Sequence, residues 1–219
     1  HIAFLLALLL LLRSLKVLVW MVTGFTLGHS ITLALAALGW IIPDLDIVEA
    51  AIGFTIALVA VQNIAVLTGN HRQITYFSVV GLLLIVLINL IWNIGLSALS
   101  GLGLALFTLA YLWNSADEHL SANLRLVTSV IFGLIHGFGF ASALTETGLA
   151  NTRLLPALLG FNLGIELGQI VIIAVVWALL QQIRQSRFLT DTRLVIDLVS
   201  AALCGLGLYW FIGRSYGII

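Results

Sequence analysis

The chain has 219 residues, of which 62% are hydrophobic and 8% are charged, and its mean hydropathy is +1.19. A water-soluble domain carries about 25% charged residues, so this chain does not have enough polar residues to cover itself with a polar surface. Its formal net charge is +0, which argues against the basic surface of a nucleic-acid-binding protein. The composition therefore predicts an integral membrane protein whose partner is the lipid bilayer, with no nucleic-acid partner.

The apolar runs are continuous and about 20 residues long, which is the length of a membrane-spanning helix rather than of a barrel strand. They predict an all-α, polytopic transmembrane helical bundle of about eight helices, forming a single transmembrane domain over residues 1–219. Short loops that carry glycine, proline or charged residues separate them. In chain order, the predicted segments are 1–12, 17–39, 47–68, 74–94, 99–115, 124–145, 154–181 and 194–213.

The first predicted segment begins at His1, inside an apolar run. We therefore expect this helix to be truncated at its start, and an exported segment to precede it. Segment 1–12 is not typical of a signal peptide, because no basic region precedes it and no small-residue cleavage site follows it.

The basic residues of the loops predict the orientation of the bundle. If the loop with Arg13 and Lys16 is cytoplasmic, alternate loops place seven of the nine basic residues inside, and only Arg153 and Arg214 fall outside. This excess follows the positive-inside rule. The seven are Arg13, Lys16, Arg72, Arg125, Arg184, Arg187 and Arg193. We therefore expect both ends of this chain on the outer side.

Three ionisable side chains lie near the middle of predicted membrane helices, namely His29, His136 and Glu166. A charge at the bilayer centre costs about 2.5–3.5 kcal/mol on the mildest scale, so such residues should face the bundle interior and have partners. Glu49 and His1 lie nearer the ends of their segments. One intramembrane histidine is often only an interhelical hydrogen bond, but two histidines and a glutamate, each beside glycines, favour a shared site.

Helical spacing supports that shared site. Asn162, Glu166 and Gln169 follow an i, i+4, i+7 pattern, so they lie on one face of their helix. Pairs of glycines four residues apart, which let helices approach closely, flank the ionisable residues on two helices. These pairs are Gly133 with Gly137, and Gly164 with Gly168. Close approach would bring a histidine of one helix within reach of a carboxylate on another.

Neutral imidazole and carboxylate ligands suit borderline divalent metals such as nickel, cobalt, zinc or copper(II). The chain has one cysteine and one methionine, so it lacks the sulfur ligands of a copper(I) site. It also lacks the carboxylate cage of a calcium or magnesium site. No organic cofactor is indicated. Because imidazole must be deprotonated to bind a metal, binding would release protons, and this coupling could serve transport.

The same pattern occurs twice: a helix with a glycine-flanked histidine is followed by a helix with a glutamate. It occurs first in segments 17–39 and 47–68, and again in segments 124–145 and 154–181. This pattern suggests a parallel 4+4 repeat of the helices.

Five stretches together resemble the HupE/UreJ family of bacterial membrane proteins. They are HIAFLLALLL, FTLGHSITLALAALG, VEAAIGFTIAL, FGLIHGFGFASAL and FNLGIELGQ. The resemblance implies a nickel or cobalt permease, or an accessory protein of hydrogenase and urease maturation, in the bacterial inner membrane. It also implies metal-handling roles for His29, His136 and Glu166. His1 looks like the histidine of the family's first helix, and Glu49 matches the family's VEA position.

The residues leave three functions open. The first is a permease for a divalent transition metal ion, which is not an enzyme. The second is an accessory or structural subunit of a larger membrane complex. Residues 70–122 look like an extra hairpin without a family motif, which would fit a chain embedded among partner subunits. The third is an intramembrane hydrolase in which a histidine-bound zinc activates water and Glu166 acts as base, although no nucleophile motif supports it. Homo-oligomers and partner subunits both stay open. The candidate metal ligands are His1, His29, Glu49, His136, Asn162, Glu166 and Gln169.

Overall fold

The computed structural model describes residues 1–11, 14–92, 94–115, 121–140, 151–185 and 192–219. Regular structure in these ranges is helical throughout, which confirms the predicted all-α bundle. Each predicted segment coincides with one helix, although the last residues of segment 124–145 lie outside the described ranges. The helices are α1 (Ile2–Leu11), α2 (Leu15–Ala37), α3 (Leu45–Thr68), α4 (His71–Trp92), α5 (Ala98–Ser115), α6 (Ser121–Phe138), α8 (Asn151–Gln185) and α9 (Thr192–Ser215).

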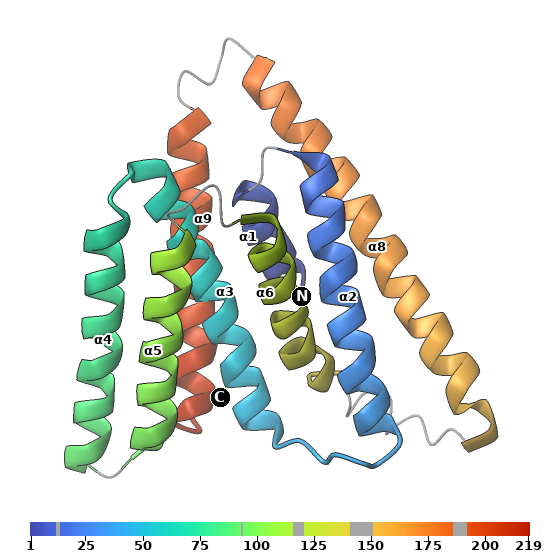
Figure 1. The fold of residues 1–219 in the computed structure, drawn as a ribbon, viewed down its shortest axis with the longest axis horizontal. Helices are drawn as coiled ribbons and strands as arrows, with labels where there is room; N and C mark the ends of the chain where they lie inside the picture. The colour runs from blue at the N-terminus through green and yellow to red at the C-terminus, as the bar shows by residue number, and fades with distance from the viewer. Residues whose placement is uncertain (12–13, 93, 116–120, 141–150, 186–191) are drawn as a thin grey trace.

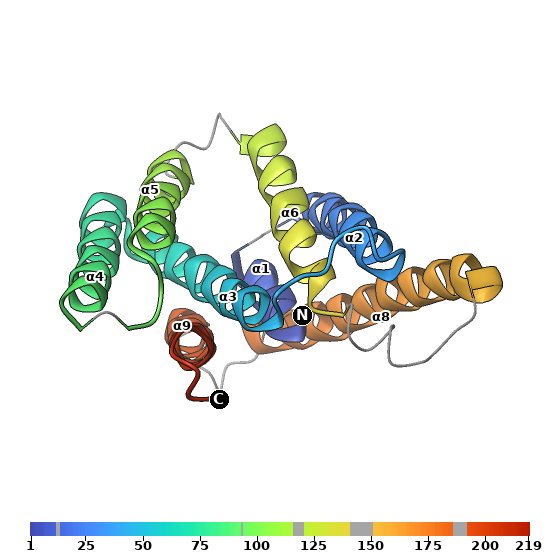
Figure 2. The same cartoon turned by 90° about the horizontal axis from the view of Figure 1, so that it is seen from below.

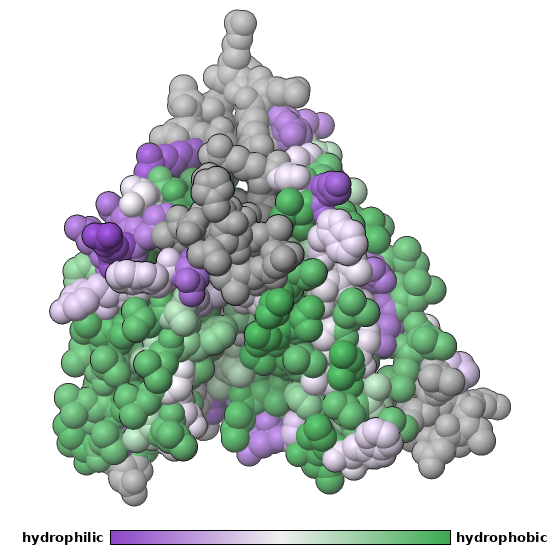
Figure 3. Space-filling model, viewed as in Figure 1, coloured by the Kyte–Doolittle hydropathy of each residue, from purple (hydrophilic) through white to green (hydrophobic). Residues whose placement is uncertain are grey.

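Most of these helices are long enough to cross a bilayer. Within the described residues, six have the length and hydropathy for it: α2, α3, α4, α5, the Pro156–Leu179 part of α8 and the Arg193–Ser215 part of α9. Leu126–Phe138 of α6 is a shorter apolar stretch. Figure 3 shows apolar side chains over α4 and α5, where lipid would lie. The chain is therefore a multi-pass membrane protein by length and composition.

Successive helices run in opposite directions, so the loops alternate between the two ends of the bundle (Figure 1). Lys16, Arg72 and Arg193 stand at the starts of α2, α4 and α9, at one end, and Arg214 stands at the other. The side chains of the other basic residues lie outside the described part of the chain. This arrangement is compatible with the predicted orientation, but which end faces the cytoplasm stays a prediction.

Helix α3 runs through the centre of the bundle and has well-defined caps. Its N-cap is Asp44, whose carboxylate accepts hydrogen bonds from the backbone N–H groups of Asp46 (3.1 Å) and Ile47 (3.4 Å). It ends at Gly69, whose φ of +71° is the left-handed conformation that glycine adopts most easily. These caps set the depth at which its polar residues lie.

Helices α2 and α6 pack backbone against backbone through their glycines. A Cβ atom on Gly28 would lie 2.2 Å from the carbonyl oxygen of Val130, and one on Gly133 would lie 2.1 Å from that of Phe25. A Cβ on Gly137 would meet the next turn of α2 just as closely. The predicted close approach through Gly133 and Gly137 is therefore confirmed, and it brings the mid-helix histidines of α2 and α6 together.

A second close approach, which the sequence analysis did not predict, joins α3 to α9. A Cβ atom on Gly53 would lie 2.8 Å from the carbonyl oxygen of Gly207, and one on Gly207 would lie 2.7 Å from that of Gly53. Because each glycine faces the other's backbone, this contact holds the end of α9 against the start of α3.

The prediction for the second glycine pair was wrong. A Cβ atom on Gly164 or Gly168 of α8 would have no neighbour within 4 Å in the described part of the chain. Helix α8 instead packs on α2 and α1 through a face that contains Gln169. Figures 1 and 2 show α8 and α4 on opposite sides of the bundle. A parallel 4+4 repeat would pair them as α9 pairs with α3, so this part of the packing departs from the repeat, whereas α2 does pack on α6, and α3 packs on α6 as α2 packs on α8.

Helices α4 and α5 form the hairpin expected within residues 70–122. They pack mainly on each other and touch the rest of the bundle through α3 and through the Phe132 ring of α6, which contacts Phe107 and Tyr111. Asn89 of α4 donates a hydrogen bond to the carbonyl of Leu96 in the hairpin loop (3.2 Å) and accepts one from Tyr216 beyond α9. The hairpin lies at one side of the bundle (Figure 2).

Candidate metal site

Three imidazole rings meet inside the bundle, one each from α2, α6 and the residue that precedes α1. His29 and His136 have 0% exposed surface. The ring of His1 lies 5.2 Å from that of His29 and 4.8 Å from that of His136, measured between centroids, and both contacts are edge to face. Three predicted site residues that are distant in sequence thus form one group, called the histidine cluster below.

Phenyl rings surround the histidine cluster. Phe4 and Phe25 lie 4.8 and 5.1 Å from the His136 ring, and Phe140 lies 4.3 Å from the His1 ring. Phe25 and Phe4 also stack on each other, at 5.1 Å. These rings offer the imidazoles no conventional hydrogen-bond acceptor, so the polar partners of the cluster are few and each one matters.

Thr55 of α3 determines which nitrogen of His136 carries the proton. The Thr55 hydroxyl lies 2.8 Å from the Ile52 carbonyl oxygen and 2.8 Å from His136 Nε2. A carbonyl can only accept, so the single hydroxyl proton goes to Ile52, and Thr55 accepts a hydrogen bond from His136 Nε2–H. The neutral ring then keeps a lone pair on Nδ1, which is buried and has no hydrogen-bond partner in the described part of the chain. Metal-binding histidines are commonly held in this way by a partner on their second nitrogen.

His29 has even fewer polar partners. Both of its ring nitrogens are buried and make no hydrogen bond with the described residues. The side chain of Asn162 on α8 approaches the ring, and its amide oxygen is also buried without a hydrogen-bond partner. Buried polar atoms rarely stay unpaired in folded proteins, so these atoms are candidates for contact with a ligand.

Gln169 reaches the same region from the next turns of α8. It is buried, and its amide oxygen accepts a hydrogen bond from the hydroxyl of Thr26 on α2 (3.1 Å). Together with His1 and Phe140 it lines a cavity of about 160 Å³ between α1 and α8. Glu166, on the same helix, is half-buried, and its carboxylate has no ion pair or hydrogen bond with the described residues. The predicted face thus brings two amides to this region, while the carboxylate of Glu166 has no polar contact among the described residues.

Glu49 lies at a second cavity, near the start of α3, rather than in the cluster itself. Its carboxylate makes an ion pair with Arg214, with 2.6 Å between Oε2 and Nε. Both side chains line a cavity of about 300 Å³ that His1 and Phe140 also line. His1 therefore lines both cavities, and Glu49 shares one of them with it.

The family model described as "HupE / UreJ protein" matches residues 1–111 and 96–214. The chain belongs to the HupE/UreJ family. This family is associated with nickel or cobalt transport or with accessory functions. The two matches together include the α4–α5 hairpin, where the sequence analysis found no family motif. No curated protein and no solved structure matches the chain.

The HupE/UreJ histidines do not form a ready coordination site. Over the ranges that the structure describes, no group of three or more His, Cys, Asp or Glu side chains is arranged to hold a metal ion. The three rings of the histidine cluster touch by edge and face, and side-chain rotation would be needed to aim their nitrogens at one ion. The donor types fit a borderline divalent metal, and the predicted ligand set stays a prediction.

Two residues at this HupE/UreJ site were missed from sequence. Thr55 bonds the backbone of its own helix, as threonines in helices often do, but the same oxygen also holds His136. Arg214 was used only to predict orientation, yet it pairs with Glu49. Residues i and i+4 on a helix can be paired from sequence, but α3 meets α6 and α9 only in the folded bundle, so neither partnership could be found that way.

Proposed function

We propose that this chain is a permease for a divalent transition metal ion, with nickel or cobalt as its cargo. The observation that supports the proposal most is the histidine cluster, in which His29 and the Nδ1 atom of His136 have no hydrogen-bond partner among the described residues. Uncharged imidazole nitrogens in a buried place are suitable ligands for such ions. The family association favours nickel and cobalt over zinc and copper(II), which the same ligand types would accept.

The proposed path begins at the outer cavity. Glu49 meets the ion first, because it lies near the start of α3, at the outer end of the bundle. It lines the cavity of about 300 Å³ that His1 also lines. The ion then passes to the histidine cluster, where the side-chain oxygens of Asn162 and Gln169 add donors from α8, and Glu166 supplies a carboxylate on the same helix. His136 stays neutral with its proton on Nε2, so no proton needs to leave Nδ1 for it to bind the ion.

The same proposal places the protein in the bacterial inner membrane, with Glu49 and Arg214 at the outer face. The end of the bundle with Lys16, Arg72 and Arg193 then faces the cytoplasm, as the positive-inside rule favours. Under this orientation the acidic start of α3 faces the side from which a cation would be taken up.

The test is uptake of nickel and cobalt by cells that express the whole protein. A His29→Ala/His136→Ala variant should lose uptake to the background of cells without the protein, at equal abundance in the membrane. A His71→Ala variant is the matched control, because His71 lies at the start of α4, outside the histidine cluster, and it should transport as the wild type does. Equal uptake by the double variant and the wild type would refute the proposal.

A further inference from the structure

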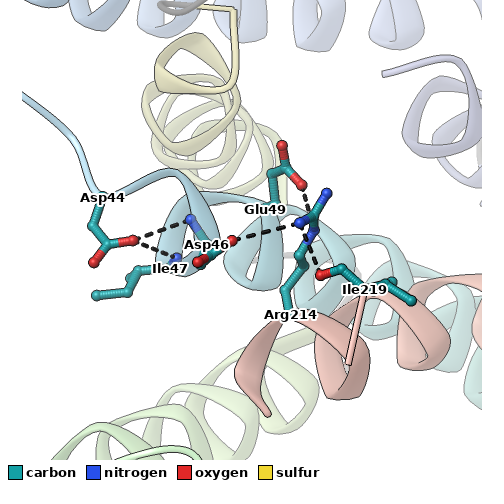
Figure 4. Close-up of polar contacts among 6 residues, drawn as sticks. All are labelled: Asp44, Asp46, Ile47, Glu49, Arg214 and Ile219. Carbon is teal, nitrogen blue, oxygen red and sulfur yellow. Dashed lines mark hydrogen bonds and ion pairs between the residues drawn. The ribbon is translucent and has the colours of Figure 1, made fainter. Parts of the chain in front are cut away.

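Arg214 stands at the mouth of the outer cavity and contacts two carboxylates of α3. Its Nε lies 2.6 Å from Glu49 Oε2, and its Nη1 lies 3.5 Å from Asp46 Oδ1 (Figure 4). Nη1 also donates a hydrogen bond to the carbonyl oxygen of Ile219 (2.8 Å). The arginine belongs to the last turn of α9, and the close contact of Gly53 with Gly207 holds that helix against α3. Its position is thus set by the packing of two helices.

The ion pair lies nearer the end of the bundle than the histidine cluster does, because Glu49 is near the start of α3 and Arg214 is in the last turn of α9, whereas Thr55, which contacts His136, lies further along α3. The same cavity of about 300 Å³ is lined by Glu49, Arg214 and Trp210 and also by His1 and Phe140. His1 in turn contacts the rings of both buried histidines. An ion that enters from this end therefore passes the Glu49–Arg214 pair before it reaches the cluster.

While Arg214 holds Glu49, that carboxylate is not free to bind another cation. A guanidinium keeps its charge at any physiological pH, so only its movement can free Glu49. The pair is partly open to solvent, with 33% of the Arg214 side chain and 40% of the Glu49 side chain exposed. Such pairs are weak and exchange readily. Asp46 is 69% exposed and already lies within 3.5 Å, so it offers Arg214 a second partner.

Asp44 is the remaining acidic residue at this end among those that the structure describes, and it is engaged elsewhere. Asp44 uses its carboxylate to cap α3 through the N–H groups of Asp46 and Ile47. Among the described side chains that line the cavity, Arg214 is then the cation and Glu49 the anion that face each other across its mouth.

We propose that Arg214 is the gate of the outer cavity, which is closed while Arg214 pairs with Glu49 and opens when Arg214 shifts to Asp46. The opening frees Glu49 to bind a divalent cation on its way to His1. The binding of a divalent cation by the freed Glu49 rests on the proposed permease function, whereas the opening of the cavity by Arg214 does not.

The opening is tested by chemical labelling of a cysteine inside the cavity. Ile52 lines the cavity, so an Ile52→Cys reporter in a Cys204→Ala background measures access of a neutral methanethiosulfonate reagent from outside. Arg214→Gln should speed the labelling about fivefold, as expected for loss of a partly exposed ion pair, and Arg214→Lys should change it by less than about twofold. Equal rates in Arg214→Gln and its parent would overturn the gate. Trp210→Cys, on the same cavity, serves if the first reporter does not accumulate.

Nickel uptake then separates the gate from the permease. Arg214→Gln and Glu49→Gln both break the ion pair, so both should speed labelling. Arg214→Gln should raise the initial rate of nickel uptake at low nickel concentration, because it keeps the Glu49 carboxylate. Glu49→Gln should lower that rate, because it removes the carboxylate. Faster labelling without nickel uptake by any form would leave the gate standing and refute the permease. Normal nickel uptake with unchanged labelling would refute the gate alone.

Discussion

The hydroxyl of Thr55 accepts a hydrogen bond from Nε2 of His136, at 2.8 Å, while it donates its own proton to the carbonyl of Ile52. This single contact joins α3 to α6 and fixes the proton of a fully buried imidazole on the nitrogen that faces α3. It leaves Nδ1 with its lone pair, and it makes Thr55 a positioning residue for the proposed metal site.

Replacing Thr55 by valine tests that role, because valine keeps the shape of the side chain and removes the hydroxyl. The His136 N–H would then lose its partner, and we expect nickel affinity and uptake to fall about tenfold, as for other residues that orient metal-binding histidines. Thr55→Ser keeps the hydroxyl and should retain most of the activity. Metal binding to the purified protein and uptake by cells would both be measured. Full activity of Thr55→Val would contradict the role of the hydrogen bond.

The glycine contact between α2 and α6 predicts a clear difference between two glycine-to-alanine changes. Gly133→Ala would place a methyl group 2.1 Å from the carbonyl oxygen of Phe25, and the helices would have to separate. We expect a loss of about 1–3 kcal/mol in the free energy of unfolding, which is the range for overpacked interiors. Gly164→Ala is the matched control, because its methyl group meets no described neighbour. Thermal unfolding in detergent measures both, and equal midpoints would show that α2 and α6 are not in backbone contact.

The link between α2 and α8 can be tested by a double-mutant cycle. Thr26 donates a hydrogen bond to Gln169, and both side chains are buried. Thr26→Val and Gln169→Leu should each destabilise the protein, and the double variant should lose less than the sum, with a coupling energy of about 0.6 kcal/mol, as is typical between membrane helices. Strictly additive effects would mean that the two side chains do not interact in the membrane.

Glu166 has no polar contact with the described residues, and this has a functional consequence. In the described part of the chain, its carboxylate has no ion pair or hydrogen bond, so it is not held against His29 or His136. We expect Glu166→Gln to keep measurable nickel uptake, whereas His136→Ala should abolish it. If Glu166→Gln and His136→Ala lost uptake equally, this expectation would be wrong, and the Glu166 carboxylate would be as necessary for metal binding as the His136 imidazole.

The number and order of the helices could be predicted from sequence, because apolar runs of bilayer length are interrupted by polar loops. The meeting of His29 with His136 could also be predicted in part. Their flanking glycines permit close helix approach, and a buried imidazole needs a polar partner. The glycines of α8 carried the same signal and yet pack against nothing described, so spacing alone does not determine which small-residue face is used.

Other features depend on contacts between helices that are distant in sequence. The pairing of α3 with α9 requires Gly53 to meet Gly207, and neither residue identifies the other. The Glu49–Arg214 ion pair follows from that packing, since it places the end of α9 beside the start of α3. A residue such as Thr55 has two roles at once, and only the folded bundle reveals the second.

The central claim is that this chain itself carries nickel or cobalt across a membrane through the histidine cluster. The most direct measurement is flux into liposomes that contain the purified whole protein and a nickel-sensitive dye. We predict flux with the wild type and only the leak of protein-free liposomes with His29→Ala/His136→Ala, reconstituted to the same density. Wild-type liposomes that admit no more nickel or cobalt than protein-free ones would contradict the claim and favour an accessory role within a larger membrane complex.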